Sequence, residues 1–213
     1  MKHLQFLTHA TDRYTELEEV KMALQGGCRW IQLRMKGAPA NEILAVGKEA
    51  VSLCHRQRAI LILDDRVDLC PLIGADGVHL GRHDMPVAAA RKILGPQSII
   101  GATVNTVEDL RRAVDAGADY VGCGPFRFTT TKEHLAPLLG LEGYRLLVAA
   151  RKELSVQLPL IAIGGITRDD IPDILSTGVD GVALSGCVVR ADNPIKEMQQ
   201  ICKYWCPLKT ETT

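Results

Sequence analysis

The sequence predicts a single-domain α/β protein in which eight βα units form a closed (β/α)8 barrel, and three observations carry this prediction. Short apolar runs alternate with stretches of helical periodicity along nearly the whole chain, and eight such runs can be counted. Gly-Ala-Asp or Gly-Val-Asp stands before an apolar run at residues 74–76, 117–119 and 178–180, as a repeated joint between a helix and the next strand. No linker or change of composition marks a second domain. Alternating βα units give a parallel sheet, and eight of them favour closure over the alternative, an open doubly wound sheet.

Each predicted strand is a short apolar run that stops at glycine or at polar residues, and helix ends carry their usual signals. Thr106 followed by Asp109 resembles a capping pair, and Gly74, Gly117 and Gly178 stand where helices are expected to stop. The predicted strands are Leu4–Thr8, Trp30–Met35, Ala59–Asp64, Gly77–Gly81, Ser98–Thr103, Tyr120–Gly124, Leu160–Gly164 and Gly181–Ser185. The predicted helices are Glu16–Gln25, Asn41–Gln57, Pro86–Leu94, Val107–Ala116, Leu141–Leu154, Asp170–Ser176 and Pro194–Trp205, with a weaker one at Val67–Ile73 that Pro71 interrupts. We expect residues 1–206 to form the barrel and residues 207–213 to form a polar C-terminal tail.

Composition and charge narrow the class of protein. Apolar residues make up 46% of the 213 residues. The 25 acidic residues balance 25 basic ones, so there is no excess of positive charge of the kind that binds nucleic acid or an acidic membrane surface. No apolar run approaches the roughly 18 residues of a spanning helix, and the start, MKHLQFLTHA, is too short and polar for a secretory signal. Seven scattered cysteines without a C-x-x-C pair indicate buried thiols in a reducing compartment. We therefore expect a cytoplasmic protein without nucleic-acid or membrane partners; the sequence allows a homo-oligomer and gives no oligomeric state.

Cations gather at the end of the second predicted strand. Gln32, Arg34 and Lys36 alternate with Leu33 and Met35, so the three polar side chains share one side of the strand. In a closed barrel of this kind the reaction face lies at the carboxyl ends of the strands. Two cations on one face repel each other unless an anion lies between them. The pattern therefore favours an anion site over a solvated strand end paired with surface acids.

Acidic side chains follow the third and fourth predicted strands. Asp64 and Asp65 end the third strand, and the fourth leads to Asp84. Carboxylates at neighbouring strand ends can hold Mg²⁺, which takes one or two of them together with substrate phosphates. The alternatives are a turn residue for Asp64 and a helix cap for Asp84. His79 lies inside its strand and is expected to be a hydrogen-bonded core histidine.

Hydroxyls, glycines and a lysine mark the remaining strand ends. Small residues expose backbone N–H groups, hydroxyls donate to phosphate oxygens, and a lysine neutralises their charge, although a polar connecting loop after the sixth strand is the alternative. Together with the cations and acids above, these features suit one diphosphate that leaves with magnesium and one monophosphate that stays. The residues concerned are Thr103, Thr129, Thr131, Lys132, Gly164, Gly165, Leu184 and Ser185.

These motifs together closely resemble thiamine phosphate synthase, a family of TIM barrels, and the match runs in order from Gln32 to Gly186. The family joins 4-amino-2-methyl-5-hydroxymethylpyrimidine diphosphate to thiazole phosphate and releases diphosphate and thiamine phosphate. The related thiazole tautomerase is an alternative, but that isomerase needs neither Asp65 with Asp84 nor the Thr-x-Thr-Lys run. A non-catalytic phosphate-ligand sensor and a barrel from histidine or tryptophan synthesis are further alternatives. The resemblance rests on Gln32-Leu33-Arg34-x-Lys36, Asp65-Arg66, Gly74–Gly81 with Asp84, Gly124-Pro125 with Thr129-x-Thr131-Lys132, Ile163–Ile166, and Ser185.

The resemblance implies a role for each matched position. It makes the protein a transferase in which Arg34, Lys36 and Lys132 are catalytic cations and Asp65 and Asp84 hold Mg²⁺. The expected substrate-binding residues are Gln32, Asp64, Thr103 and Gly164, with Thr129, Thr131, Gly165, Leu184 and Ser185 on the side of the thiazole phosphate.

The chain departs from the family pattern at three positions. The family usually has Asn where this chain has Asp64, Ser where it has Thr103, and Ala where it has Gly186. Thr103 keeps the hydroxyl, and Gly186 is a small change. Asp64 places a negative charge near the diphosphate, which magnesium or Arg34 has to offset.

The implied chemistry is dissociative. The aminopyrimidine ring stabilises a methylene carbocation, and fixed positive charges stabilise the departing diphosphate as its charge grows. The thiazole nitrogen then captures the carbocation. Water has to be kept out, and the segment from Phe126 to Leu139 is long enough to act as a lid.

Overall fold

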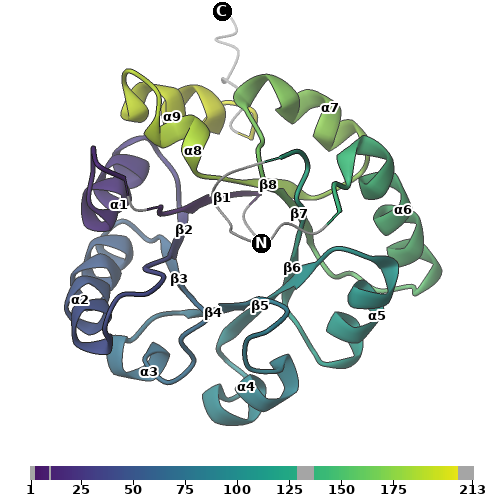
Figure 1. Cartoon of the computed structure of the whole chain (residues 1–213), viewed down its shortest axis with the longest axis horizontal. Coiled ribbons are helices and arrows are strands. Elements are labelled where there is room, and N and C mark those ends of the chain that lie inside the picture. Colours follow the sequence, from purple (N-terminus) through teal and green to yellow (C-terminus); the bar gives the residue numbers. More distant parts are fainter. Residues whose placement is uncertain (1–2, 10, 129–136, 206–213) are drawn as a thin grey trace, which may run out of the picture.

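Eight parallel strands close into a barrel, and helices cover its outside (Figure 1). The computed structural model describes residues 3–9, 11–128 and 137–205. Neighbours along the chain are also neighbours in the sheet, from β1 to β8, and β8 pairs with β1 to close the ring. The closed barrel is thereby confirmed, and the open doubly wound sheet is excluded. The expected tail at 207–213 lies outside the described residues.

All eight predicted strands are present, with each end within two residues of the prediction. The largest difference is at the second strand, which stops at Leu33 instead of Met35. The observed strands are β1 Leu4–Leu7, β2 Trp30–Leu33, β3 Ile60–Asp64, β4 Gly77–Leu80, β5 Ile99–Val104, β6 Tyr120–Cys123, β7 Leu160–Ile163 and β8 Gly181–Leu184.

The helices also follow the prediction, with two short additions. The weak third helix shrinks to Cys70–Ile73, and Pro71 lies in its first turn, where its missing N–H breaks no helical hydrogen bond. The additions are η1 (Arg168–Asp170) and α8 (Gly186–Val189), both too short to produce a helical period. The other helices are α1 Glu16–Gln25, α2 Ala40–Arg56, α4 Val87–Leu94, α5 Val107–Asp115, α6 Gly140–Glu153, α7 Ile171–Ser176 and α9 Pro194–Cys202.

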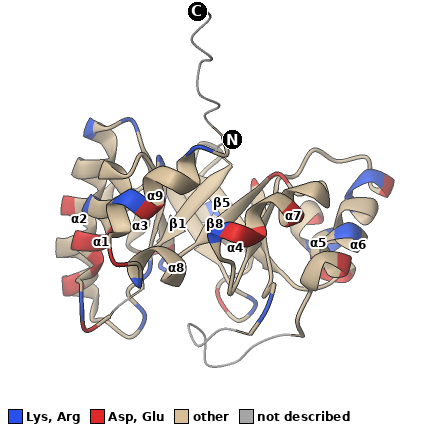
Figure 2. Cartoon of the chain, turned by 90° about the horizontal axis from the view of Figure 1, so that it is seen from above, with Lys and Arg blue, Asp and Glu red and all other residues tan. Residues whose placement is uncertain are grey.

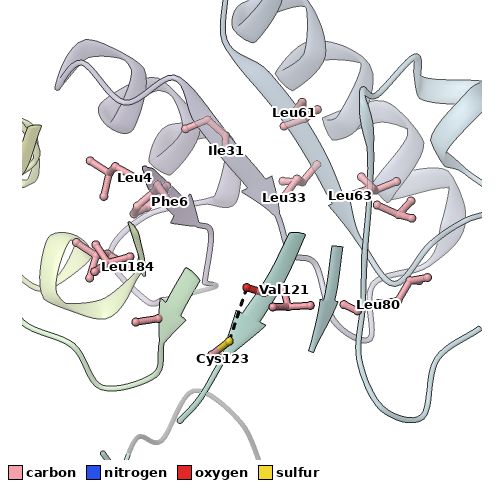
Figure 3. Packing of buried hydrophobic residues seen from close by; sticks show 14 of the residues in the cluster. Leu4, Phe6, Ile31, Leu33, Leu61, Leu63, Leu80, Val121, Cys123 and Leu184 are labelled. Atoms are coloured by element: carbon pink, nitrogen blue, oxygen red, sulfur yellow. Dashed lines mark hydrogen bonds between the residues drawn. The ribbon is translucent and has the colours of Figure 1, made fainter. Parts of the chain in front are cut away.

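Side chains alternate between the inside of the barrel and the layer beneath the helices. The inner cluster consists of Leu7, Trp30, Ile62, Tyr120, Ile161 and Ala183. Their neighbours along the strands belong to the outer layer, where Leu4, Phe6 and Leu184 meet (Figure 3). Inside the barrel, a Cβ on Gly101 would lie 2.2 Å from Cζ of Tyr120, so the absence of a side chain there makes room for the ring. On β2, β3 and β5, polar side chains follow the apolar inner residues toward the carboxyl ends, where the candidate site lies: Gln32, Asp64 and Thr103.

The repeated Gly-x-Asp joints form a clamp at the amino ends of the strands. In one of them, Asp119 accepts the N–H of Ile100 at 2.7 Å and pairs with Arg91 at 2.6 Å. The glycine two residues before it adopts φ 77°, which ends the preceding helix. This face of a barrel serves stability, which leaves the opposite face to the candidate site. The other two joints repeat the arrangement with Asp76, Leu61 and His55, and with Asp180, Leu160 and Arg151.

The outer surface carries mixed charge. Acidic and basic residues alternate along the outer helices in the view of Figure 2, in keeping with equal numbers of acids and bases. Among the described ranges, no helix combines the length and the apolar character needed to cross a bilayer. Six cysteines in these ranges are free thiols, and burial raises the pKa of Cys28 and of Cys123 to about 12.

Candidate active site

The ends of β2 and β3 hold a carboxylate between an amide and a guanidinium. Gln32 lies on β2, and its Nε2 donates to Oδ1 of Asp64, the last residue of β3, at 2.5 Å. The other carboxylate oxygen of Asp64 lies 3.6 Å from Nε of Arg34, and both side chains are mostly buried, with 18% and 15% exposed. The negative charge that distinguishes this chain at position 64 is therefore offset by Arg34 within the protein itself.

Arg34 is held in place through its main chain. Its N–H donates to the hydroxyl of Thr8 at 2.8 Å, and its carbonyl accepts from that hydroxyl at 3.2 Å. Thr8 is fully buried just beyond β1, next to β2 in the barrel. One buried hydroxyl thus continues the β1–β2 pairing beyond the last residue of each strand.

Lys36 reaches the same region by a route that the sequence does not predict. We expected β2 to continue to Met35 and strand alternation to place Lys36 beside Arg34, but the strand ends at Leu33. A turn follows in which Ala38 N donates to Met35 O at 3.2 Å and Gly37 adopts φ 81°. The exposed Lys36 lines a cavity together with Asp64 and Asp65, and its charge opposes the rise that burial causes in the pKa of Asp65.

Asp65 and Asp84 form a carboxylate pair beside these cations. Burial, followed by the nearby charge of Asp84, raises the pKa of Asp65 against the opposing effects of Lys36, Arg66 and Arg34. Asp65 adopts φ 56°, which is uncommon for a residue with a side chain, and its N–H donates to His79 O at 2.9 Å. Two adjacent carboxylates of this kind suit Mg²⁺, which needs few protein ligands when substrate phosphates complete its shell. The described ranges contain no group of three or more metal-ligating side chains.

Asp84 is fixed by the turn after β4. Its Oδ2 accepts the N–H of Gly81 at 2.6 Å, and the helix that follows has Pro86 at its N-cap position. Asp84 is therefore a turn residue and does not cap that helix. Its other carboxylate oxygen has no hydrogen-bond partner among the described residues.

His79 connects the interior polar residues of several strands. Its Nδ1 lies 3.0 Å from the Tyr120 hydroxyl, its Nε2 lies 3.1 Å from the Thr103 hydroxyl, and Gln5 Nε2 donates to Tyr120 at 3.2 Å. His79 is buried, as expected for a hydrogen-bonded core histidine. The network also places the half-buried Thr103 at the inner wall of the site. Sequence reasoning missed the network because its partners lie far apart along the chain.

The turn after β7 packs against the segment that follows β6 and forms hydrogen bonds with it. Gly164 and Gly165 adopt φ 97° and 72°, and a Cβ on Gly165 would lie 3.0 Å from the carbonyl oxygens of Arg127 and Phe128. Arg127 N donates to Gly164 O at 3.1 Å, and its guanidinium pairs with Asp170 at 2.5 Å. Within the described ranges, the N–H groups of Gly165 and of the next residue have no hydrogen-bond partner. These glycines therefore serve both to pack a loop and to expose backbone donors.

Ser185 lies next to that turn, just beyond β8. Ile163, the last residue of β7, pairs with Ala183 on β8, so the turn after β7 and Ser185 leave the ends of neighbouring strands. The hydroxyl of Ser185 is buried and has no hydrogen-bond partner among the described residues. The side chain of Leu184 packs in the outer layer, 2% exposed, so only its main chain is left for a ligand.

Three expected residues, Thr129, Thr131 and Lys132, lie outside the described residues. The chain on either side of them is fixed: Leu139 N donates to Pro125 O at 2.9 Å, and Gly140 N donates to Phe126 O at 3.2 Å. Phe126 N in turn donates to Ile163 O at 2.9 Å, at the end of β7. The two described ends of this segment thus meet beside the Gly164-Gly165 turn.

Comparison with known proteins agrees with this arrangement. Residues 4–188 match the family model described as thiamine monophosphate synthase. A curated relative from Bacteroides thetaiotaomicron, named thiamine-phosphate synthase, is 56% identical and the match covers 94% of this chain and 96% of that protein. One of the same name from Phocaeicola vulgatus is 54% identical over 93% and 95% of the two chains. The solved structure described as thiamine phosphate pyrophosphorylase from Pyrococcus furiosus superposes with a TM-score of 0.84 at 38% identity, over 94% of each chain. The chain therefore belongs to the thiamine-phosphate synthase family of enzymes.

Proposed function

We propose that this protein joins 4-amino-2-methyl-5-hydroxymethylpyrimidine diphosphate to 4-methyl-5-(2-phosphoethyl)thiazole and releases thiamine phosphate and diphosphate. The observation that carries the proposal is the meeting of Arg34, Lys36, Asp65 and Asp84 at the ends of β2, β3 and β4. Membership of the family supports the same substrates. The buried thiols support a reducing, cytoplasmic location.

In the proposed reaction the pyrimidine diphosphate lies over Arg34 and Lys36. The C–O bond between the methylene carbon and the diphosphate breaks, and both bonding electrons leave with the diphosphate. Arg34 and Lys36 stabilise that growing negative charge, so they act mainly in the transition state. Lys132 adds a third cation in this proposal. Gln32 and Asp64, fixed against each other, form a hydrogen-bonding wall for the aminopyrimidine ring.

Asp65 and Asp84 would hold the metal ion of this reaction, which we propose to be Mg²⁺. The ion supplies Lewis-acid stabilisation of the diphosphate oxygens when it is bound. The charge of Asp84 that raises the pKa of Asp65 is the repulsion that a bound cation relieves. Oxygen ligands of this type match the preference of Mg²⁺.

The thiazole phosphate is proposed to lie between the turn after β7 and Ser185. The N–H of Gly165 and the hydroxyl of Ser185, which have no hydrogen-bond partner in the described part of the chain, supply donors to phosphate oxygens. Thr129 and Thr131 contribute further hydroxyls in this proposal. A thiazole held by its phosphate at this point directs its ring nitrogen toward the centre of the barrel mouth, where the nitrogen lone pair forms the new C–N bond.

The direct test is to incubate the purified protein with both substrates and Mg²⁺ and to look for thiamine phosphate by mass. Arg34→Ala should lower the rate by well over tenfold with the fold intact, because one well-placed charge contact contributes about 2–4 kcal/mol to the transition state. Circular dichroism checks the fold, and Arg111→Ala, an exposed position on α5, is the matched control. Product formation at the wild-type rate in Arg34→Ala would refute the assignment of the diphosphate site. Thiazole isomerisation without diphosphate release would instead identify a tautomerase.

A further inference from the structure

Arg190 folds back over the first residue of α8. It follows the last helical residue, and its guanidinium occupies the space where a side chain at position 186 would be: Nη1 and Nη2 would lie 2.5 Å from a Cβ on Gly186. The guanidinium therefore rests against the main chain directly after Ser185. Only glycine at position 186 leaves room for this conformation.

The charge of Arg190 faces the corner of the barrel mouth between β8 and β1. Burial lowers the pKa of His9, and the charges of Arg34 and Arg190 lower it further. His9 follows β1, which pairs with β8 through Phe6 and Leu184. Nδ1 of His9 and the Ser185 hydroxyl are both buried without a hydrogen-bond partner in the described part of the chain. Two polar atoms without hydrogen-bond partners and one guanidinium thus lie near the ends of β8 and β1.

Arg190 differs from the other arginines near the β7 and β8 turns because its charge is not committed to a carboxylate. Arg127 pairs with Asp170 at 2.5 Å, and Arg168 pairs with Glu197 at 2.8 Å. In residues 3–9, 11–128 and 137–205, the guanidinium of Arg190 forms no ion pair or hydrogen bond, and only its backbone N–H donates, to Gly186 O at 3.0 Å. An exposed guanidinium that packs against the backbone and has no carboxylate partner is suited to bind an anion from solution.

We propose that Arg190 binds the phosphate group of the thiazole substrate and that Gly186 serves to admit its guanidinium. This inference rests on the proposed function, which puts that phosphate beside Ser185. The backbone N–H of Gly165 and the hydroxyl of Ser185 are neutral donors, whereas a phosphate monoester carries up to two negative charges near neutral pH. Arg190 supplies positive charge and a two-pronged donor from the β8 side. It thereby selects the phosphorylated thiazole over its free alcohol.

The test compares Arg190→Ala, Arg190→Lys and Gly186→Ala with wild type, measuring KM for each substrate and the Kd of thiazole phosphate by calorimetry. Arg190→Ala should raise both the KM and the Kd for thiazole phosphate about tenfold, as expected for loss of one charged hydrogen-bonding partner. KM for the pyrimidine diphosphate should stay within about twofold, which a general structural defect would not achieve. Arg190→Lys should fall in between, because an ammonium keeps the charge and loses the fork.

Gly186→Ala provides the sharper test because it leaves Arg190 present and moves only the flexible end of its side chain. It should weaken thiazole phosphate binding nearly as much as Arg190→Ala. Added to Arg190→Ala it should have no further effect, because both changes remove the same contact. Arg111→Ala is the control for loss of a surface charge.

Three outcomes would overturn the inference: an unchanged Kd for thiazole phosphate in Arg190→Ala, a larger effect on the pyrimidine diphosphate, or additive effects of the two changes. Failure of the proposed function is a separate result, namely that the wild type forms no thiamine phosphate from the two substrates. Calorimetry with thiazole phosphate alone does not depend on turnover and so still reports on Arg190 in that case.

Discussion

At the scale of single residues, Asp64 places a negative charge in the proposed diphosphate site. Its carboxylate accepts from Gln32 and lies 3.6 Å from Nε of Arg34, so in the proposed reaction it would compete with the diphosphate for Arg34. The charge of Arg34 thus has a partner within the protein itself. The cost of this arrangement is repulsion between Asp64 and the substrate.

We therefore expect Asp64→Asn to bind pyrimidine diphosphate more tightly. The amide oxygen still accepts from Gln32, while the charge that opposes the diphosphate is gone. Repulsion between the Asp64 carboxylate and the diphosphate should weaken binding by about 1 kcal/mol, so KM should fall roughly fivefold when it is removed. Steady-state kinetics with thiazole phosphate saturating measures it, with Asp64→Ala as the comparison that also removes the partner of Gln32. A higher KM in Asp64→Asn would mean that the carboxylate itself binds substrate.

Asp84 is the residue at which the metal proposal can be tested by titration. In Asp84→Ala the pair loses one carboxylate, so the Mg²⁺ concentration for half-maximal rate should rise by about tenfold or more. The same variant should lower the pKa of Asp65, because the nearby negative charge that helps to raise it is removed. Asp68→Ala, an exposed carboxylate paired with Arg66, is the control. An unchanged metal titration would take Asp84 out of the metal shell.

At the scale of elements, α1 is fastened to the end of β1 through a buried carboxyl group. Glu19 is fully buried, and its Oε2 accepts the N–H of His9 at 2.7 Å, while Oε1 has no partner among the described residues. Burial raises the pKa of Glu19 from 4.5 to about 8, so the carboxyl group is mostly protonated at neutral pH. The neighbouring charge of Glu16 acts in the same direction.

This burial predicts a pH-dependent stability. The unfolded chain releases the Glu19 proton near pH 4.5, whereas the folded chain keeps it to about pH 8. Between these values the folded state binds more protons, so the free energy of unfolding falls as the pH rises. Glu19→Gln keeps the acceptor for His9 and cannot titrate. Its stability relative to wild type should therefore rise from pH 5 to pH 8, by an amount on the order of 3 kcal/mol.

Urea unfolding at several pH values measures this difference. Glu108→Gln, an exposed position on α5, is the control and should leave the pH profile unchanged. A constant difference between Glu19→Gln and wild type across the range would contradict the raised pKa.

Elements with strong local signals were predictable from sequence, and those set by contacts between strands were not. The capping pair of Thr106 and Asp109 and the left-handed glycines fixed helix ends correctly because those signals act within a few residues. The four residues of α8 carry no periodicity, so that helix was missed. Strand alternation was the wrong basis for placing Lys36 beside Arg34, because β2 ends at Leu33. Where that strand ends depends on the hydrogen bonds that its neighbouring strands offer.

At the scale of the whole molecule, the eight-stranded barrel was predictable because the same unit repeats. The candidate site followed from the rule that all carboxyl ends share one face. The network of His79, Tyr120 and Gln5 was beyond sequence reasoning, because it depends on which inner side chains share a level across several strands. The same holds for Arg190, whose conformation is decided by the missing side chain at Gly186.

Closure of the barrel gives the last prediction. At the seam between β8 and β1, His3 O accepts from Val182 N at 2.9 Å, and a Cβ on Gly181 would lie 2.0 Å from that same oxygen. Gly181→Ala therefore forces β1 and β8 apart and should lower the free energy of unfolding by about 3 kcal/mol. Gly117→Ala is the matched control: its Cβ meets nothing within 4 Å, so it carries only the strain of φ +77°, about 1 kcal/mol. Urea unfolding measures both variants. Equal losses in the free energy of unfolding would show that β1 and β8 adjust to the added methyl group without strain. If the ring is one cooperative unit, a defect at this seam should shift a single unfolding transition and should not create a second one, because every strand depends on both neighbours.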